Sequence, residues 1–189
     1  MITGVLVLAA GRATRFGTDK RFASLPDGRC VIDTTLANIR DSGLPFLVCL
    51  GEDDDELMHR LDEQKIQWLR CNRAAEGMGS TLAEGVGHIP GWNGVLVALA
   101  DMPWIAPSTY LAVAERLSQE RIIVPVCNGL RGHPVGFGCG FYADLCALRG
   151  DTGARQLLAM HAGSVVELTV MDPAIHRDID VPADMFLSD

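Results

Sequence analysis

The feature that most constrains the fold of this chain is the alternation of apolar, β-rich runs with helical patterns from its beginning to its end. Six runs predict strands, at residues 4–8, 46–50, 66–71, 95–99, 122–126 and 165–170. Six stretches predict helices, at about 33–41, 54–62, 80–86, 107–118, 142–147 and 153–161. This order is typical of an α/β fold in which crossover helices cover both faces of a mostly parallel sheet. Because no repeat or break in composition interrupts it, we expect a single domain over residues 1–189.

The charge and the cysteine pattern exclude several classes of function. A formal net charge of -8 disfavours binding to nucleic acid or to an anionic membrane, since such surfaces need clustered Lys and Arg. The six cysteines form no C-x-x-C pair and are expected to be small buried side chains in a reducing compartment. The apolar run at 5–10 is too short for a signal peptide or a membrane span. We therefore expect a cytoplasmic protein without nucleic-acid or membrane partners.

A glycine-rich loop follows the first expected strand. Gly11 and Gly17 permit positive φ angles and close backbone approach, while Arg15 and Lys20 supply cationic donors. Backbone amides and cations of this kind can surround a polyphosphate. The spacing matches neither the P-loop G-x-x-x-x-G-K-[ST] nor the dinucleotide pattern G-x-G-x-x-G. From these residues alone, an ordinary strand-to-helix turn with exposed basic side chains is an equal alternative.

The string L-A-A-G-x-x-x-R-x-G-x-x-K at 8–20 resembles the signature of the MobA-like nucleotidyltransferases, specifically the molybdenum cofactor cytidylyltransferases. Similar motifs follow in the family's order at 25–28, 76–82, 99–103, 132–135, 150–155 and 178–184. The resemblance implies a Rossmann-like three-layer sandwich of the nucleotide-diphospho-sugar transferase type. It also implies Mg²⁺-dependent transfer of a nucleoside monophosphate from an NTP to the phosphate of the molybdenum cofactor, a pyranopterin, with release of pyrophosphate. A molybdoenzyme or its chaperone is then an expected partner.

The resemblance carries roles onto individual residues. It implies that the nucleotide is bound by Leu8, Ala9, Ala10, Gly11, Arg15, Lys20, Gly77, Gly79 and Ser80. Within that set, Arg15 and Lys20 would contact the triphosphate and act catalytically together with Asp101. Ala10 favours CTP over GTP, because guanylyltransferase relatives more often have glycine there. Ala13 departs from the family, which often has serine at that position.

Two carboxylates are candidates for a metal site. Asp101 closely follows the run at 95–99, and Pro103 prevents the strand from continuing, so the carboxylate should lie at the ligand edge of the sheet. Mg²⁺ bound to a nucleotide needs one or two carboxylates in addition to phosphate oxygens and water. Alternation within a short strand puts Asp178 and Asp180 on one face, so either could point at the metal. The resemblance favours Asp180 as the partner of Asp101.

Several acidic residues, Asp101 among them, can also be explained without a metal. Asp101, on position alone, could be a turn or helix-capping residue. Asp184 is expected to be solvated or to cap a helix or turn. The acidic run at 52–56 opens an expected helix, where the macrodipole favours negative charge, so we interpret it as a solvated helix start rather than a metal site.

The resemblance places His133 beside the acceptor substrate, and Asp151 and Arg155 are two further candidates for contact with the acceptor. His133 lies between two runs that read as strands, and a neutral imidazole could hydrogen-bond a phosphate or a pterin edge. A turn residue made rigid by Pro134 is nearly as good an explanation. Asp151 and Arg155 flank the start of an expected helix, where a phosphate can bind.

Three alternative functions remain open from the sequence. One is nucleotidyl transfer to another phosphorylated acceptor, such as a sugar or polyol phosphate, or transfer from GTP. A second is a nucleotide-binding chaperone without chemistry, which has no need of a metal pair and a cationic loop. A third is a dinucleotide-dependent oxidoreductase, which predicts a G-x-G-x-x-G loop that this chain lacks.

Overall fold

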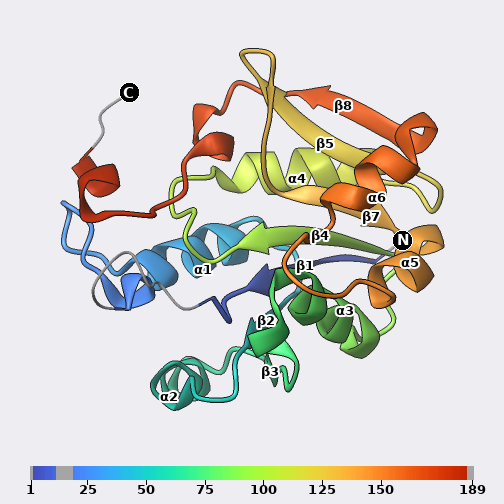
Figure 1. Ribbon diagram of the computed structural model, residues 1–189. Helices are drawn as coiled ribbons and strands as arrows, with labels where there is room; N and C mark the ends of the chain where they lie inside the picture. The colour runs from blue at the N-terminus through green and yellow to red at the C-terminus, as the bar shows by residue number, and fades with distance from the viewer. Residues whose placement is uncertain (1, 12–18, 187–189) are drawn as a thin grey trace.

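The computed structural model describes residues 2–11 and 19–186, and their strands form one mixed sheet (Figure 1). The strands are β1 (Thr3–Leu8), β2 (Phe46–Leu50), β3 (Trp68–Arg70), β4 (Gly94–Leu99), β5 (Ile122–Cys127), β6 (Leu130–Arg131), β7 (Val135–Gly138) and β8 (Val165–Thr169). Their order is β3-β2-β1-β4-β7-β5-β6, with β8 also paired to β5. The pairs β1–β2, β1–β4, β2–β3 and β5–β8 are parallel, whereas β7 runs antiparallel to β4 and β5, and β6 antiparallel to β5.

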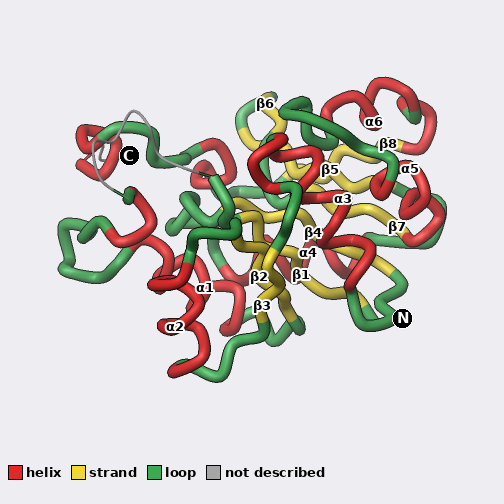
Figure 2. The backbone as a smooth tube through the Cα atoms, turned by 60° about the horizontal axis from the view of Figure 1, so that its bottom comes forward, coloured by secondary structure: helices red, strands yellow, loops and turns green. Residues whose placement is uncertain are grey.

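Helices cover both faces of this sheet, as Figure 2 shows by the red segments around the yellow strands. They are α1 (Val31–Asp41), α2 (Asp55–Glu63), α3 (Met78–His88), α4 (Pro107–Arg116), α5 (Tyr142–Cys146) and α6 (Arg155–Met160). Side chains of α1, α2 and α4 belong to one hydrophobic core, and those of α3, α5 and α6 to a second core. The expected three-layer α/β sandwich is therefore confirmed. No helix in the described part of the chain is long and apolar enough to cross a membrane.

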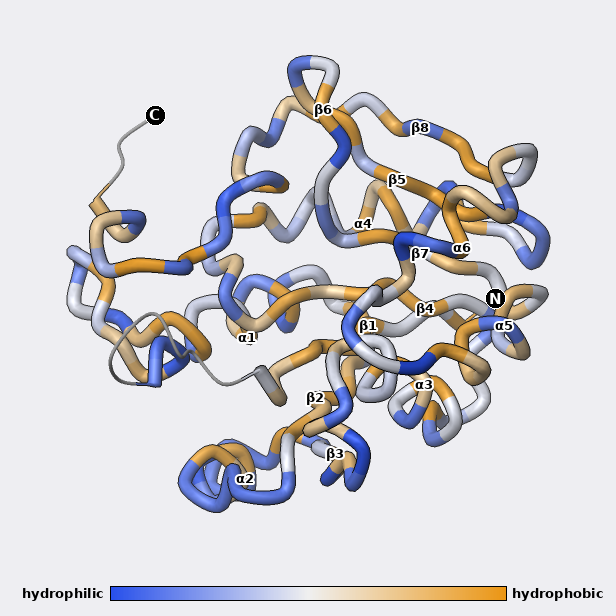
Figure 3. The backbone as a smooth tube through the Cα atoms, viewed as in Figure 1, coloured by the Kyte–Doolittle hydropathy of each residue, from blue (hydrophilic) through white to orange (hydrophobic). Residues whose placement is uncertain are grey.

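The central strands owe their position to uninterrupted apolar sequence. In β1, Val5 and Val7 belong to the first core and Leu6 to the second, and all three are fully buried. A continuous apolar run of this kind is typical of a strand covered on both faces, and each such side chain contributes roughly 1.5–3 kcal/mol on burial. In Figure 3 the path of β5 is mainly hydrophobic, whereas hydrophilic colour dominates α2.

All six expected strands are present, and the two runs flanking residues 132–134 form β6 and β7. One helix start differs from the expected one in a way that matters for the site, because α3 begins at Met78 rather than at Ser80. β3 is also shorter than expected, because the main-chain amide of Ile66 donates to Leu61 at the end of α2 (2.9 Å) instead of joining the sheet.

The register of the parallel strands brings three loops to one edge. Leu8 pairs with Cys49 of β2 and with Leu99 of β4, so the residues that follow each strand lie side by side. The C-terminal segment, red in Figure 1, returns to this edge beside the blue segment before α1. There the amide of Ile179 donates to the carbonyl of Asp101 (3.0 Å), and its side chain packs with Leu25 and Val31. The strand ends and the C-terminal segment thus surround one region.

Candidate active site

A cavity of about 840 Å³ lies at the carboxyl ends of β1, β2 and β4. Of the residues assigned to a site from the sequence, its wall includes Leu8, Ala9, Ala10, Gly11, Lys20, Gly77, Asp101, Asp151 and Asp180. These residues come from six separate stretches of the chain, and Asp178 joins them. The cavity has the position expected for a ligand in an open α/β sheet. Arg15, Ala13 and Gly17 lie outside the described residues.

The centre of the site is an ammonium group held between two carboxylates. Lys20 Nζ lies 2.7 Å from Asp101 Oδ2 and 3.0 Å from Asp180 Oδ1, although the three residues are far apart in sequence. The side chains of Lys20 and Asp101 are only 14% and 19% exposed, whereas that of Asp180 is 56% exposed. Among the described residues, the other carboxylate oxygen of Asp101, Oδ1, is buried and has no hydrogen-bond partner. Asp101 therefore has one oxygen on Lys20 and one still available.

The pKa values of Lys20 and Asp178 are shifted by the charges that lie close together here. Burial disfavours the charged form of Lys20, but the hydrogen bonds and charges of Asp101 and Asp180 more than offset it and raise the Lys20 pKa. Burial, together with the charges of Asp101 and Asp180, raises the pKa of the Asp178 carboxyl. Two carboxylates thus share one ammonium with a third, Asp178, near them, and their negative charge favours a further cation.

The residues present fit a divalent cation that brings ligands of its own. No three His, Cys, Asp or Glu side chains in the described ranges are arranged to hold a metal by themselves. The pair Asp101 and Asp180, with the available Oδ1 of Asp101, matches Mg²⁺ bound through one or two carboxylates, with phosphate oxygens and water completing its shell. Both candidate metal ligands face the same cavity.

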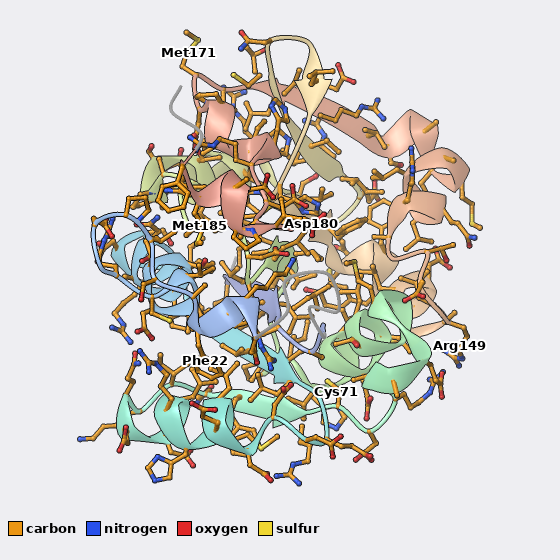
Figure 4. The ribbon with its side chains drawn as sticks, turned by 60° about the vertical axis from the view of Figure 1, so that its left-hand side comes forward. Phe22, Cys71, Arg149, Met171, Asp180 and Met185 are labelled. Carbon is orange, nitrogen blue, oxygen red and sulfur yellow. The ribbon has the colours of Figure 1, made fainter. Side chains whose placement is uncertain are left out.

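Asp180 is held in place by its own turn. Asp184 Oδ2 accepts hydrogen bonds from the main-chain amides of Asp180 (2.9 Å) and Val181 (2.8 Å), so the capping role expected for Asp184 is confirmed. In Figure 4 Asp180 lies near the middle of the molecule, and Met185 belongs to the turn that follows it. Met185 packs against the cluster formed by Leu25, Val31 and Ile179. The turn that carries Asp180 is therefore anchored on both sides.

Arg21 is a site residue whose role the sequence did not reveal. Its side chain is only 8% exposed, and its guanidinium donates to the carboxylate of Asp19 (2.5 Å), to Asp54 Oδ1 (2.5 Å) and to the carbonyl of Ala9 (2.5 Å). Asp54 Oδ2 in turn accepts from the amide of Gly51 (2.6 Å). Burial opposes the charge, but these partners raise the Arg21 pKa above its ordinary value. Arg21 thus joins the loops after β1 and β2 to the short 3-10 segment that carries Lys20.

The interpretation of residues 52–56 as a solvated helix start is wrong for Asp54. Its side chain is 11% exposed and is paired with Arg21. Glu52, Asp53 and Asp54 all line the cavity, so the acidic run forms one of its walls. An i,i+33 ion pair leaves no local signal in a sequence, which is why the pairing was not foreseen.

The glycines at the start of α3 serve a close approach of two loops. A side chain on Gly77, whose φ is +125°, would meet the Asp151 carboxylate at 2.2 Å, and one on Gly79 would meet the carbonyl of Gly150 at 2.8 Å. The amide of Gly79 also donates to that carbonyl (2.7 Å), and the amide of Met78 donates to Asp151 Oδ1 (3.3 Å). Gly77 and Asp151 face the cavity. Gly79 instead packs against the loop 149–153.

Ser80 does not reach the cavity, contrary to the role expected for it. Its side chain is fully buried; its hydroxyl donates to Glu76 (2.9 Å) and accepts from the amide of Gly150 (3.1 Å). Because α3 begins two residues earlier than expected, Ser80 lies inside the first turn of the helix and faces the protein interior. It connects the loop before α3 to the loop 149–153 rather than offering its hydroxyl to a ligand.

His133 and Arg155 are not part of the cavity wall. The main-chain amide of His133 donates to Ile175 (2.9 Å), and its ring Nδ1 lies 3.5 Å from the carbonyl of Val97. Burial lowers the pKa of the imidazole, against the opposing influence of Val97, Asp101 and Asp178. This placement favours a packed turn residue close to the carboxylates. Arg155 is the exposed first residue of α6.

The described wall of the cavity is strongly acidic. It contains seven carboxylates, from Glu52, Asp53, Asp54, Asp101, Asp151, Asp178 and Asp180, against the two basic side chains of Lys20 and Arg21. A polyphosphate that approached these carboxylates would be repelled by them unless a metal cation came with it. This part of the wall therefore favours a phosphate ligand that arrives together with a divalent metal.

Comparisons with known proteins identify the family and several relatives. The family described as MobA-like NTP transferase domain matches residues 5–165. The purine catabolism protein PucB of Bacillus subtilis is 26% identical over 93% of this chain and 90% of its own length. The nicotine blue oxidoreductase of Paenarthrobacter nicotinovorans is 26% identical over 98% of this chain and 95% of its own.

Solved structures show the same architecture. Rv0371c of Mycobacterium tuberculosis superposes with a TM-score of 0.85 at 25% identity, covering 97% of this chain and 94% of that one. A second structure of Rv0371c, in complex with manganese, gives a TM-score of 0.80 at 24% identity and covers 97% and 95% of the two chains.

Proposed function

We propose that this chain, which belongs to the family of MobA-like NTP transferases, moves a cytidylyl group from CTP to the phosphate of the molybdenum cofactor and releases pyrophosphate. The observation that carries the proposal is the meeting of Asp101 and Asp180 around a single cation position, beside the loop 8–11. The preference for CTP rests on Ala10, and the pyranopterin acceptor rests on the motifs at 132–135 and 150–155. Mg²⁺ is the proposed cofactor.

The chain's own residues would perform positioning and charge stabilisation. The backbone of residues 8–11 lines the space for the nucleotide, and Arg21 fixes that backbone through the carbonyl of Ala9. Asp101 and Asp180 would hold the metal, which supplies positive charge to the phosphate oxygens when bound. The ammonium of Lys20, together with Arg15, would bind the departing pyrophosphate.

The transfer needs no covalent enzyme intermediate. An oxygen of the acceptor phosphate attacks the α-phosphorus of CTP and forms the new P–O bond. The bond to the bridging oxygen of the β-phosphate breaks, and pyrophosphate leaves with its electron pair. The acceptor phosphate is already an anion near neutral pH, so no protein base is required to activate it. The residues therefore act by alignment and by electrostatics.

Two further observations support parts of this proposal. Rv0371c forms a complex with manganese, which supports a divalent cation in this fold. The cysteines in the described chain are all free thiols, which supports action in a reducing compartment such as the cytoplasm. The nucleotide-bearing cofactor would then pass to a molybdoenzyme or its chaperone.

One relative favours a second candidate function. The nicotine blue oxidoreductase, by its name, carries out redox chemistry, and it matches nearly the whole chain. An NAD(P)-dependent reduction would place a dinucleotide in the same cavity. The loop at 8–20 lacks the G-x-G-x-x-G pattern of dinucleotide sites, and the carboxylate pair has no role in hydride transfer. Nucleotidyl transfer therefore accounts for more of the site.

A substrate panel tests the proposal. The purified protein is incubated with Mg²⁺ and each of CTP, GTP, ATP and UTP, with the molybdenum-bound pyranopterin phosphate, a sugar 1-phosphate or a polyol phosphate as acceptor, and pyrophosphate is measured. We expect the fastest release with CTP and the pterin. Clear preference for another acceptor or for GTP would replace that part of the proposal. Oxidation of NADH or NADPH in the presence of nicotine blue, without pyrophosphate release, would favour the reductase instead.

A further inference from the structure

Lys20 occupies the place that a metal would need. Its ammonium contacts Asp101 Oδ2 at 2.7 Å and Asp180 Oδ1 at 3.0 Å, and these are the two carboxylates suited to a divalent cation. Mg²⁺ binds carboxylate oxygens at about 2.0–2.1 Å, so a metal on both side chains would lie within a few ångströms of Lys20 Nζ. Two cations this close repel each other strongly in a partly buried site. The ammonium and the metal therefore compete for the same oxygens.

We propose, on the basis of the nucleotidyltransferase function above, that Lys20 is an internal cation that holds Asp101 and Asp180 together in the nucleotide-free protein and must leave them when metal and nucleotide bind. The metal alone then binds weakly, because it has to displace the ammonium without offering it another partner. A nucleotide triphosphate supplies that partner. Metal and nucleotide consequently bind with positive coupling.

The surroundings of Lys20 allow its side chain to move while its backbone stays fixed. The adjacent residue, Arg21, is anchored by Asp19, Asp54 and the carbonyl of Ala9. Lys20 itself lines the cavity, and a lysine ammonium on its flexible four-carbon stem can reach more than one position. An oxygen on the triphosphate would replace the carboxylates as its partner.

The positions of Asp101 and Asp180 also favour replacement of the Lys20 ammonium by a metal. Asp101 Oδ1 is buried without a hydrogen-bond partner among residues 2–11 and 19–186, so a metal that reached it would not have to break a hydrogen bond. Asp180 is 56% exposed and open to the cavity, and Asp184 fixes its backbone. The backbone that carries Asp180 can therefore stay in place when Lys20 leaves.

The chain contains only two lysines, Lys20 and Lys65, which gives the test a matched control. Lys65 is exposed at the end of the α2 region, away from the cavity wall. Binding of Mn²⁺ alone is titrated by the electron paramagnetic resonance of the free ion, for the unaltered protein, Lys20→Met and Lys65→Met, without nucleotide. We expect Lys20→Met to bind Mn²⁺ at least fivefold more tightly than the unaltered protein, and Lys65→Met to bind it equally.

Two further measurements keep the result decisive. Adding a non-hydrolysable CTP analogue should tighten Mn²⁺ binding at least tenfold in the unaltered protein but much less in Lys20→Met. Adding Asp101→Asn to Lys20→Met should abolish the gain, because the metal would lose a ligand. Equal or weaker Mn²⁺ binding by Lys20→Met, or a gain that survives Asp101→Asn, would overturn the proposal.

A measurement on the unaltered sequence covers the case in which Lys20→Met does not fold. Lysine labelled with ¹³C at Cε gives one resonance from each of the two lysines. We expect Mg²⁺ alone to leave both in place and Mg²⁺ with the CTP analogue to shift only Lys20. A Lys20 resonance that stays unchanged at saturating metal and nucleotide would contradict displacement. These binding measurements involve no acceptor and no turnover. A negative result would therefore reject the displacement of Lys20 without rejecting the transfer reaction. Conversely, the discovery of a different acceptor would not affect the displacement of Lys20.

Discussion

The guanidinium of Arg21 donates a 2.5 Å hydrogen bond to the carbonyl of Ala9, and this contact ties the end of the first strand to the segment that carries Lys20. The same guanidinium binds Asp19 and Asp54. Removing a buried cation that has three acceptors lowers the stability of the fold, because the charges of its partners are left without compensation. The geometry of the nucleotide loop therefore depends on a residue that need not touch the nucleotide.

Replacing Arg21 by Met should lower the free energy of unfolding by about 3 kcal/mol, since Asp19 and Asp54 lose their buried partner. Urea denaturation measures this. The control is Arg29→Met, which removes an exposed ion pair with Asp27 and should cost less than about 1 kcal/mol. Equal losses in the two variants would contradict the role given to Arg21.

Two glycines of α3 should respond in opposite ways to alanine. Gly79→Ala puts a methyl group 2.8 Å from the carbonyl of Gly150 and should destabilise the protein, since either α3 or the loop 149–153 must shift. Gly87→Ala meets nothing within 4 Å and should stabilise the helix by up to about 1 kcal/mol. Thermal unfolding of both variants checks this, and a stabilising Gly79→Ala would show that the two loops do not pack as described.

The hydroxyl of Tyr110 should contribute nothing to stability. Tyr110 is fully buried on α4, and its hydroxyl has no hydrogen-bond partner within the described chain. Removing an unpaired buried polar group is neutral or favourable, so Tyr110→Phe should change the free energy of unfolding by no more than about 0.5 kcal/mol or increase it. Tyr110→Ala should cost about 3–5 kcal/mol through loss of the ring. A loss above about 1 kcal/mol in Tyr110→Phe would reveal a partner for the hydroxyl.

Much of the fold could be predicted from local patterns. The run at 4–8 is apolar without interruption because β1 is covered on both faces, and that pattern needs no knowledge of distant residues. The position of Asp101 at the ligand edge follows from the end of its strand in the same way. The prediction that it faces a second carboxylate came from a resemblance, and the structure brings Asp101 and Asp180 to the same ammonium.

The parts that could not be predicted depend on contacts between distant segments. Arg21 and Asp54 are separated by 33 positions, and nothing in either neighbourhood marks them as partners. The resemblance assigns Gly79 to the nucleotide, but the structure gives another reason for glycine there, because a side chain at this position would collide with the carbonyl of Gly150. Ser80 looked like a helix start because its type suits that position, whereas the helix begins earlier and buries it. Residue type alone did not separate ligand contacts from loop contacts.

The most direct test of the account is pyrophosphate release from CTP, Mg²⁺ and the pterin acceptor by Asp101→Asn, measured beside the unaltered protein and the exposed control Asp27→Asn. The substitution keeps the shape of the side chain and removes the charge from the proposed metal ligand, so circular dichroism should show an intact fold. We predict at least a hundredfold loss of turnover in Asp101→Asn and no loss in Asp27→Asn, as expected when a cation that stabilises transferring phosphates is no longer held. Full pyrophosphate release by Asp101→Asn would contradict the assignment of this carboxylate, and with it the proposed active site.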